Sequence, residues 1–93
     1  MTIKVGNLAI PANSPVGTVI TNMRTVDQTG ATVNANFAIG DDQSIFAVSG
    51  TNLMLNAKPS GATPGYYAVD LVATTVGSIQ YVVDEASFVV TLS

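Results

Sequence analysis

The feature that most constrains the fold is the stretch from Tyr66 to Thr75, which reads Tyr-Tyr-Ala-Val-Asp-Leu-Val-Ala-Thr-Thr. Successive side chains of an extended strand point to opposite faces, so apolar residues at every second position share one face. Asp70 and Thr74 lie on the other face. We therefore predict a central strand with one face against a core, whose apolar residues are Tyr67, Val69, Leu71 and Ala73.

Turn signals bound this strand on both sides. Pro64-Gly65 precedes it and Gly77-Ser78 follows it, and both pairs are typical of turns. The segments Ile79–Val83 and Phe88–Leu92 are long enough to run back beside it as an antiparallel partner. Between them, Asp84-Glu85 interrupts the apolar pattern and predicts a bulge.

The rest of the chain has the same character. Short runs rich in Val, Ile, Thr and Phe recur between Gly, Pro, Asn and Asp, with almost no helical period, which is typical of an all-β sandwich. Further strands are expected at Thr2–Ile10, with a kink at Gly6-Asn7, and at Thr18–Val26, Thr32–Ile39, Ile45–Ser49 and Leu53–Leu55. The candidate core residues in them are Thr18, Ile20, Met23, Val33, Ala35, Phe37, Ile39, Phe46 and Val48, with Asn34 and Asn36 outside.

The connections between these strands carry their own signals. The segment Pro11–Pro15 cannot be an interior strand, because proline lacks the N–H that a ladder needs, so we expect an irregular crossover. Asp27–Ala31 predicts a turn in which Gly30 is the permissive residue. Gly40–Ser44 predicts a polar turn, and Asn56–Gly65 predicts the longest loop, which crosses from one sheet to the other.

Low charge is the unusual feature of the composition. Only 10% of the residues are Asp, Glu, Lys or Arg, against roughly 25% in an average soluble domain. One interpretation is that neighbours in an assembly or adjoining domains cover much of the surface. The other is a surface built of Thr, Asn, Ser and Gln, which the chain has in quantity.

Charge and hydropathy argue against several classes of partner. The net charge is −3 and the cations are Lys4, Arg24 and Lys58, so no basic patch is expected for nucleic acid. No stretch approaches the roughly 20 apolar residues of a membrane helix. The start of the chain lacks the apolar run of a signal peptide. The 93 residues fit one domain over the whole chain, 1–93, and the absence of cysteine rules out disulfides within it.

The residue types argue against an enzyme. A serine or threonine nucleophile normally needs an adjacent base, and the chain has no histidine. Paired carboxylates are what remains, and the candidates are Asp41-Asp42 and Asp84-Glu85. Sequence neighbours on a strand point apart, so neither pair converges on a substrate unless it lies in a turn. We interpret both as solvated turn residues, with an Asx-turn at Asp41 or Asp42.

A calcium site would need six to eight oxygen ligands, usually including several carboxylates. Asp27, Asp41 and Asp42 lie in expected loops that could meet at one end of a sandwich. No Asp-x-Asp spacing appears among them, however. We therefore expect surface carboxylates, with no metal and no cofactor.

The nominally outer face of the last two strands carries apolar side chains, where a sandwich normally has polar ones. One of Val82 and Val83 must point outward, and so should Val89. We hypothesise that this face is an interface formed by Tyr66, Val72, Tyr81 and Val83. The alternative is ordinary scattered exposure of apolar residues.

Several of these segments together resemble a cadherin repeat. The opening Pro11-Ala12-Asn13-Ser14-Pro15-Val16-Gly17-Thr18 is similar to that of the family. Tyr67-Ala68-Val69-Asp70-Leu71-Val72-Ala73-Thr74 resembles its Tyr-x-Leu-x-Val-x-Ala-x-Asp strand, and Phe88–Leu92 resembles its closing strand. The resemblance extends from about Ile10 to Leu92 and is shared with bacterial and phage immunoglobulin-like modules. It implies a seven-stranded Greek-key immunoglobulin-like sandwich.

The calcium motifs of cadherins do not carry over. The family's Pro-Glu-Asn is Pro11-Ala12-Asn13 here, and its Leu-Asp-Arg-Glu is replaced by Leu55-Asn56-Ala57-Lys58. Thr75 stands where the family has the aspartate of Ala-x-Asp. Of the family's ligands only Asp27 has a counterpart, so calcium-dependent adhesion is not expected.

Two functional classes follow from this pattern. The first is a non-enzymatic structural or accessory subunit of a larger assembly, such as a decoration protein of a phage virion, joined through the outer face by self-association or to another protein. The second is an adhesion module, cut from a longer secreted or cell-surface protein, that binds carbohydrate or protein through a loop-end cleft. Carbohydrate is the weaker option, because tryptophan is absent and only Tyr66 and Tyr81 are placed to stack on a sugar.

Overall fold

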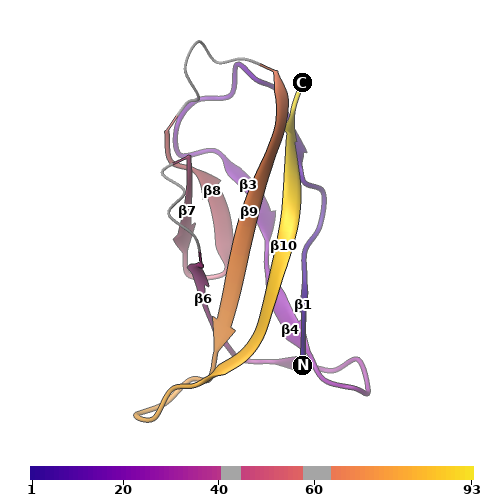
Figure 1. Ribbon diagram of the computed structural model, residues 1–93, viewed down its shortest axis with the longest axis vertical. Coiled ribbons are helices and arrows are strands. Elements are labelled where there is room, and N and C mark those ends of the chain that lie inside the picture. Colours follow the sequence, from indigo (N-terminus) through magenta and orange to yellow (C-terminus); the bar gives the residue numbers. More distant parts are fainter. Residues whose placement is uncertain (41–44, 58–63) are drawn as a thin grey trace.

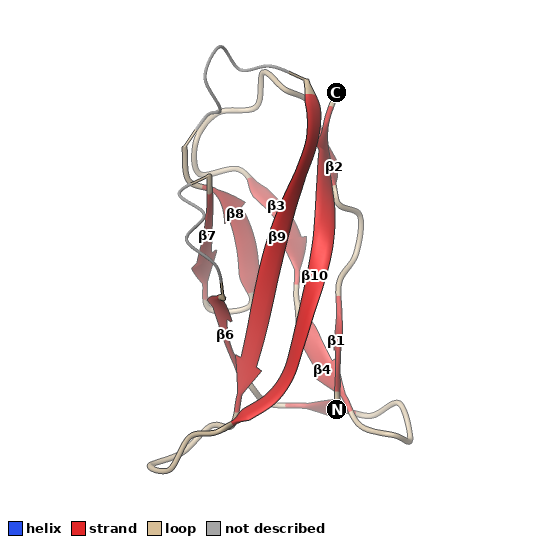
Figure 2. Ribbon diagram, in the orientation of Figure 1, coloured by secondary structure: helices blue, strands red, loops and turns tan. Residues whose placement is uncertain are grey.

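The computed structural model describes residues 1–40, 45–57 and 64–93, and within them it contains strands and turns but no helix (Figure 2). The all-β prediction is confirmed. The described strands are β1 (Thr2–Lys4), β2 (Ala9–Ile10), β3 (Val19–Asn22), β4 (Arg24–Val26), β5 (Thr32–Val33), β6 (Asn36–Ile39), β7 (Phe46–Ser49), β8 (Asn52–Leu55), β9 (Gly65–Thr74) and β10 (Val82–Leu92). The turn predicted at Gly40–Ser44 and the loop predicted at Asn56–Gly65 lie largely outside the described residues.

These strands form hydrogen-bonded sheets that face each other along an elongated molecule of 41 × 25 × 18 Å (Figure 1). The largest has the order β2-β10-β9-β6, in which β2 runs parallel to β10 and the other neighbours are antiparallel. Opposite it lies the antiparallel sheet β3-β8-β7. A third, smaller sheet has the order β1-β4-β5.

The hairpin of β9 and β10 confirms the predicted central strand and its antiparallel partner. Val69, Leu71 and Ala73 are fully buried, as the alternation predicted. The register shifts between Val82 and Asp84, next to the pair Asp84-Glu85 at which the bulge was expected. The partner is one continuous strand from Val82 to Leu92, whereas residues 79–81 belong to the turn.

The predicted first strand, Thr2–Ile10, is divided between two sheets, since β1 pairs with β4 and β2 pairs with β10. The chain changes sheet at the predicted kink. There the Gly6 N–H donates to the Thr21 hydroxyl at 2.8 Å. A Cβ on Gly6 would lie only 3.1 Å from that oxygen, so the close approach favours glycine.

Two other predicted strands are also interrupted. Thr18–Val26 divides into β3 and β4 at Met23, whose N–H donates to the Thr51 carbonyl at 2.7 Å instead of continuing a ladder. Thr32–Ile39 divides because β5 pairs with β4 while β6 pairs with β9. The inward pattern still holds in these segments: Ile20 and Met23 are buried, and Phe37 is half-buried.

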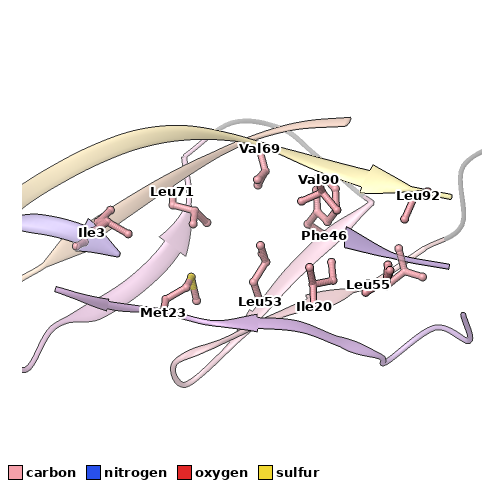
Figure 3. Packing of buried hydrophobic residues seen from close by; sticks show 12 residues of the cluster. Ile3, Ile20, Met23, Phe46, Leu53, Leu55, Val69, Leu71, Val90 and Leu92 are labelled. Atoms are coloured by element: carbon pink, nitrogen blue, oxygen red, sulfur yellow. The ribbon is translucent and has the colours of Figure 1, made fainter. Parts of the chain in front are cut away.

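The core lies between the two larger sheets (Figure 3). Figure 3 shows side chains of β9 and β10 facing those of the opposite layer, with Val69, Leu71 and Val90 against Ile20, Met23 and Leu53. The whole buried cluster comprises Ile3, Ile10, Ile20, Met23, Phe46, Leu53, Leu55, Val69, Leu71, Ala73, Val90 and Leu92. Thr25 is fully buried too, and its hydroxyl donates to the Val33 carbonyl at 2.6 Å, so this polar group is satisfied.

Candidate interaction surfaces

The solvent side of the β2-β10-β9-β6 sheet is the first candidate surface, and we call it the outer sheet face. Alternation along β9 and β10 sends every second side chain away from the core. The register pairs Tyr66 with Thr91, Ala68 with Val89, Asp70 with Ser87 and Val72 with Glu85 on this face. Ala9 and Ala38 extend it at its two edges, opposite Thr91 and Val72.

The end of this face next to the last residues of β10 is apolar. The side chain of Tyr66 is 80% exposed and that of Val89 is 53% exposed, with exposed Ala68 between them in the ladder. A cavity of about 370 Å³ borders this end, and it is lined by Pro64, Gly65, Tyr66, Thr91, Leu92 and Ser93. None of the described residues in that lining is charged, so this end of the face suits a partner with an apolar surface.

The middle of the outer sheet face is polar and acidic. The Ser87 hydroxyl donates a hydrogen bond to Oδ1 of Asp70 across the β9–β10 ladder. A cavity of about 290 Å³ lies here, lined by Gly40, Asp70, Leu71, Val72, Glu85, Ala86 and Ser87. Among the described residues that line it, the carboxylates are those of Asp70 and Glu85, and none of these residues places a base beside the Ser87 hydroxyl.

Val72 was predicted to be an interface residue, but the structure places it against a neighbouring segment. It is half-buried, and a Cβ built on Gly40 would lie 2.6 Å from its Cγ2 atom. The Gly40 N–H donates to the Asp70 carbonyl at 2.8 Å, which holds the two segments together. Much of the Val72 side chain is therefore covered within the chain itself.

The turn between β9 and β10 forms a second apolar surface, which we call the hairpin tip (Val76, Ile79, Tyr81 and Val82). Their exposed fractions are 60%, 80%, 65% and 53%. The tip is internally bonded: the Thr75 N–H donates to the Tyr81 carbonyl at 3.0 Å, and the Thr75 hydroxyl donates to the Ile79 carbonyl at 3.2 Å. Figure 1 shows it projecting beyond one end of the sheets, far from the C-terminus.

The four predicted interface residues therefore do not form one patch. Tyr66 lies near the start of β9, whereas Tyr81 lies beyond its other end, in the hairpin tip. Val83 packs against the core cluster, and Val82 is the exposed member of that pair. The shift at the bulge decides between Val82 and Val83, and alternation alone could not.

Sequence reasoning left Val76, Ile79 and Val89 out of the interface. Val76 lies between the predicted strand and the Gly77-Ser78 turn, and Ile79 begins the segment predicted to return. The exposure of a side chain at such positions cannot be inferred from alternation. Val89 could have been included, because the alternation of Phe88 to Leu92 already places it on the outer face.

The carboxylates considered for chemistry have separate structural roles. Oδ1 of Asp27 accepts hydrogen bonds from the Thr29 hydroxyl at 2.6 Å, the Thr29 N–H at 2.8 Å and the Ala31 N–H at 3.1 Å. These bonds, chiefly that from the Thr29 hydroxyl, lower the pKa of the Asp27 carboxyl. Oδ2 of Asp84 accepts from the Ile3 N–H at 2.8 Å. Asp41 and Asp42 lie outside the described residues.

Residues 1–40, 45–57 and 64–93 contain no cluster of three or more His, Cys, Asp or Glu side chains that could hold a metal ion. The same residues contain no helix long and apolar enough to cross a membrane.

No family model, no curated protein and no solved structure matches the chain.

Proposed function

We propose that this chain is a non-enzymatic structural protein, a subunit or decoration-type accessory of a larger assembly such as a phage virion, located on the particle surface. The observation that carries the proposal is the apolar end of the outer sheet face, where Tyr66 and Val89 are 80% and 53% exposed. The chain's low charge supports it, because an assembled surface needs less charge to stay dispersed.

We infer further that the fold is an interrupted version of the seven-stranded immunoglobulin-like sandwich, similar to a cadherin-like module without calcium. The pairs β1 and β2, β3 and β4, and β5 and β6 would each be one strand broken at a change of sheet. The order β2-β10-β9-β6, with β2 parallel to β10, supports this assignment. Asp27, the one counterpart of a family ligand, uses an oxygen within its own turn, which supports the absence of calcium.

The proposal of a non-catalytic role rests on the chemistry available in the acidic cavity. The Ser87 hydroxyl there donates a hydrogen bond to the Asp70 carboxylate and lacks the imidazole that would activate it, since the chain contains no histidine. Glu85, the other carboxylate among the described residues of the lining, is exposed at the strand surface. We therefore assign the cavity no reaction.

Association can be tested by measuring the molar mass in solution. We expect light scattering behind a sizing column to give a mass that rises with protein concentration, and the double variant Tyr66→Ser/Val89→Thr to lower that mass. Val19→Thr is the matched control, because Val19 is 49% exposed on β3, away from the outer sheet face. An equal mass for the double variant and the wild type would contradict the proposal.

A binding module is the second candidate, favoured by the cavity of about 370 Å³ beside Tyr66. An exposed tyrosine next to a hollow can stack on the apolar face of a sugar or on a peptide side chain. Titration with a panel of soluble saccharides, followed by the amide resonances of Gly65 and Thr91, tests this reading. Shifts that disappear in Tyr66→Ala would support it, and unchanged resonances would rule out carbohydrate at this cavity.

A further inference from the structure

Two of the chain's three basic side chains lie next to each other in the ladder of β1 and β4. Lys4 is directly opposite Arg24, and both residues are exposed. Directly opposite residues of an antiparallel pair point to the same face, with Cβ atoms about 5 Å apart. Like charges in that position repel each other, so this pair destabilises the ladder, and a bound anion would relieve the repulsion.

The described carboxylates do not neutralise this basic pair. Neither cation has an ion-pair partner within residues 1–40, 45–57 and 64–93. Those of Asp27, Asp70 and Asp84 each accept hydrogen bonds from other parts of the chain. Glu85 lies on the outer sheet face, opposite Val72 of β9. The two positive charges are therefore available to an anion from outside the chain.

A cavity beside the hairpin tip adjoins the basic pair. It has a volume of about 470 Å³, which is within the range of roughly 300–1,000 Å³ for small-molecule sites. Arg24 and Asn34 are among the described residues that line it. Asn34 directly follows Val33, which pairs with Thr25 of β4, so it continues the row of the two cations onto a third strand.

The rest of the lining is partly apolar and partly polar. Val33, Phe37 and Val76 provide apolar surface. At the β7–β8 turn, Nδ2 of Asn22 donates to the Thr51 hydroxyl at 2.8 Å. The Thr51 oxygen is the acceptor in that bond, so its own proton can be donated to a ligand. A single molecule in this cavity can therefore meet a positive charge, hydrogen-bond donors and apolar side chains.

We propose that this cavity binds a small organic carboxylate with an apolar body. The guanidinium of Arg24 and the ammonium group of Lys4 bind the carboxylate, because a planar guanidinium matches its two oxygens and the second cation adds attraction. The apolar body packs against Phe37 and Val76. The inference goes beyond the proposed function, since the site uses neither Tyr66 nor Val89.

Three matched probes test the two parts of such a ligand. Octanoate has a carboxylate and an apolar chain, octanol has the chain without the charge, and acetate has the charge without the chain. In NMR titrations, octanoate should shift the backbone amides of Arg24 and Val33 and the side-chain amide of Asn34. Its dissociation constant should be at least tenfold lower than those of octanol and acetate. Equal affinities for octanoate and octanol, or shifts confined to the surroundings of Tyr66 and Val89, would overturn the proposal.

Arg24→Gln tests the guanidinium, because it removes the charge and keeps a polar side chain. It should weaken octanoate binding at least tenfold, and Lys4→Gln should weaken it by a smaller factor. Ala9→Glu is the matched control, since it lowers the net charge by the same unit at an exposed position of β2, which Figure 2 places toward the other end of the molecule from β4. Unchanged affinity in Arg24→Gln, or an equal loss in Ala9→Glu, would overturn the proposal.

Thermal unfolding provides a second readout that separates binding from folding. Arg24→Gln removes one of two repelling charges from an exposed position, so without a probe its midpoint should be no lower than that of the wild type. Octanoate should raise the midpoint of the wild type and leave that of Arg24→Gln unchanged, since a ligand stabilises the state that binds it. An equal rise in both proteins would show that octanoate binds elsewhere and would overturn the proposal.

Discussion

Gly40 illustrates how a single residue decides what the outer sheet face can offer a partner. Without a Cβ it lets the edge segment after β6 lie against Val72 of β9. The valine stays on the face that alternation assigned to it but is half-buried there within the chain, which leaves less of it for a partner to contact.

We expect Gly40→Ala to lower the free energy of unfolding by about 1–3 kcal/mol, the usual cost of overpacking. The reason is that the new Cβ would lie 2.6 Å from Cγ2 of Val72, so one of the two segments must move. Urea denaturation of the single variants and of Gly40→Ala/Val72→Ala measures the coupling. Gly40→Ala should lower the free energy of unfolding less in the Val72→Ala background than in the wild type. An equal decrease in both backgrounds would show that the contact with Val72 is not the cause.

Asp27 predicts a pH dependence of stability. Its pKa is lowered in the folded state, first by the Thr29 hydroxyl and then by the Thr29 N–H. A lowered folded-state pKa gives stability that is fully present above the unfolded pKa, about 4, and is lost as the pH falls through the folded value. Asp27→Asn should therefore be less stable than the wild type at pH 7, and the difference should shrink toward pH 2. Urea titrations at the two pH values test it, and a difference that grows in acid would contradict it.

At the scale of elements, β10 joins parts of the fold that are far apart in the sequence. Its bulge lies next to Asp84, whose carboxylate accepts the Ile3 N–H of β1. Strands β1 and β10 belong to different hydrogen-bonded sheets, so this side chain bridges two sheets where no ladder does.

Asp84→Ala should lower the free energy of unfolding by about 1.5 kcal/mol, the value of a hydrogen bond to a charged group. The substitution leaves the Ile3 N–H without its acceptor. Asp84→Asn keeps an oxygen that can accept from the Ile3 N–H, so it should lower the free energy of unfolding by less than Asp84→Ala does. Chemical denaturation of both variants provides the comparison. If the two lose the same amount, the charge of the carboxylate matters more than the bond to Ile3.

The outcome of sequence reasoning differs between elements for a physical reason. The hairpin of β9 and β10 was predictable because alternation and glycine turns are local signals. The breaks at Gly6 and Met23 depend on Thr21 and Thr51, distant residues that bond to them only in the folded chain. Such distant partners decide where a strand changes sheet. The alternation of apolar and polar residues in the sequence therefore does not predict the position of the change.

The same distinction applies to the candidate surfaces. Exposure of Tyr66 followed from its place in the alternating run, and the structure places it on the outer sheet face. The burial of Val72 depends on a residue in another strand segment, and the orientation of Val83 depends on the bulge. The spacing of residues along the sequence predicts neither the burial of Val72 nor the orientation of Val83. The cavity beside the hairpin tip draws on segments from Asn22 to Val76, so it exists only after folding.

The whole molecule presents apolar surface at separated places, with acidic groups between them. Tyr66 and the hairpin tip lie toward opposite ends of β9, and Asp70 and Glu85 lie between on the outer sheet face. This spacing permits two independent contacts on one copy, one at each place. Such an arrangement suits a component that joins neighbours in an assembly.

Calcium should leave the stability of the whole molecule unchanged. A ligand that binds only the folded state at 100 times its dissociation constant stabilises it by about 2.7 kcal/mol. Residues 1–40, 45–57 and 64–93 contain no cluster of three acidic side chains for the ion to use. Thermal unfolding followed by circular dichroism, with millimolar calcium and then with a chelator, should give the same midpoint. A midpoint that rises with calcium would mean that ligands outside these residues hold the ion.

The pairing of β2 with the end of β10 determines when this fold can be completed during synthesis. Ile3 is 81 residues from the aspartate that accepts its N–H, a separation that takes a ribosome about 4–16 seconds to translate. Through that interval the Ile3 N–H lacks its acceptor, and β2, which contains Ile10, lacks its partner strand β10. The N-terminal apolar residues of the nascent chain are therefore exposed during this time. We expect chaperones that hold unfolded segments to contact the N-terminal strands before they contact the rest of the chain.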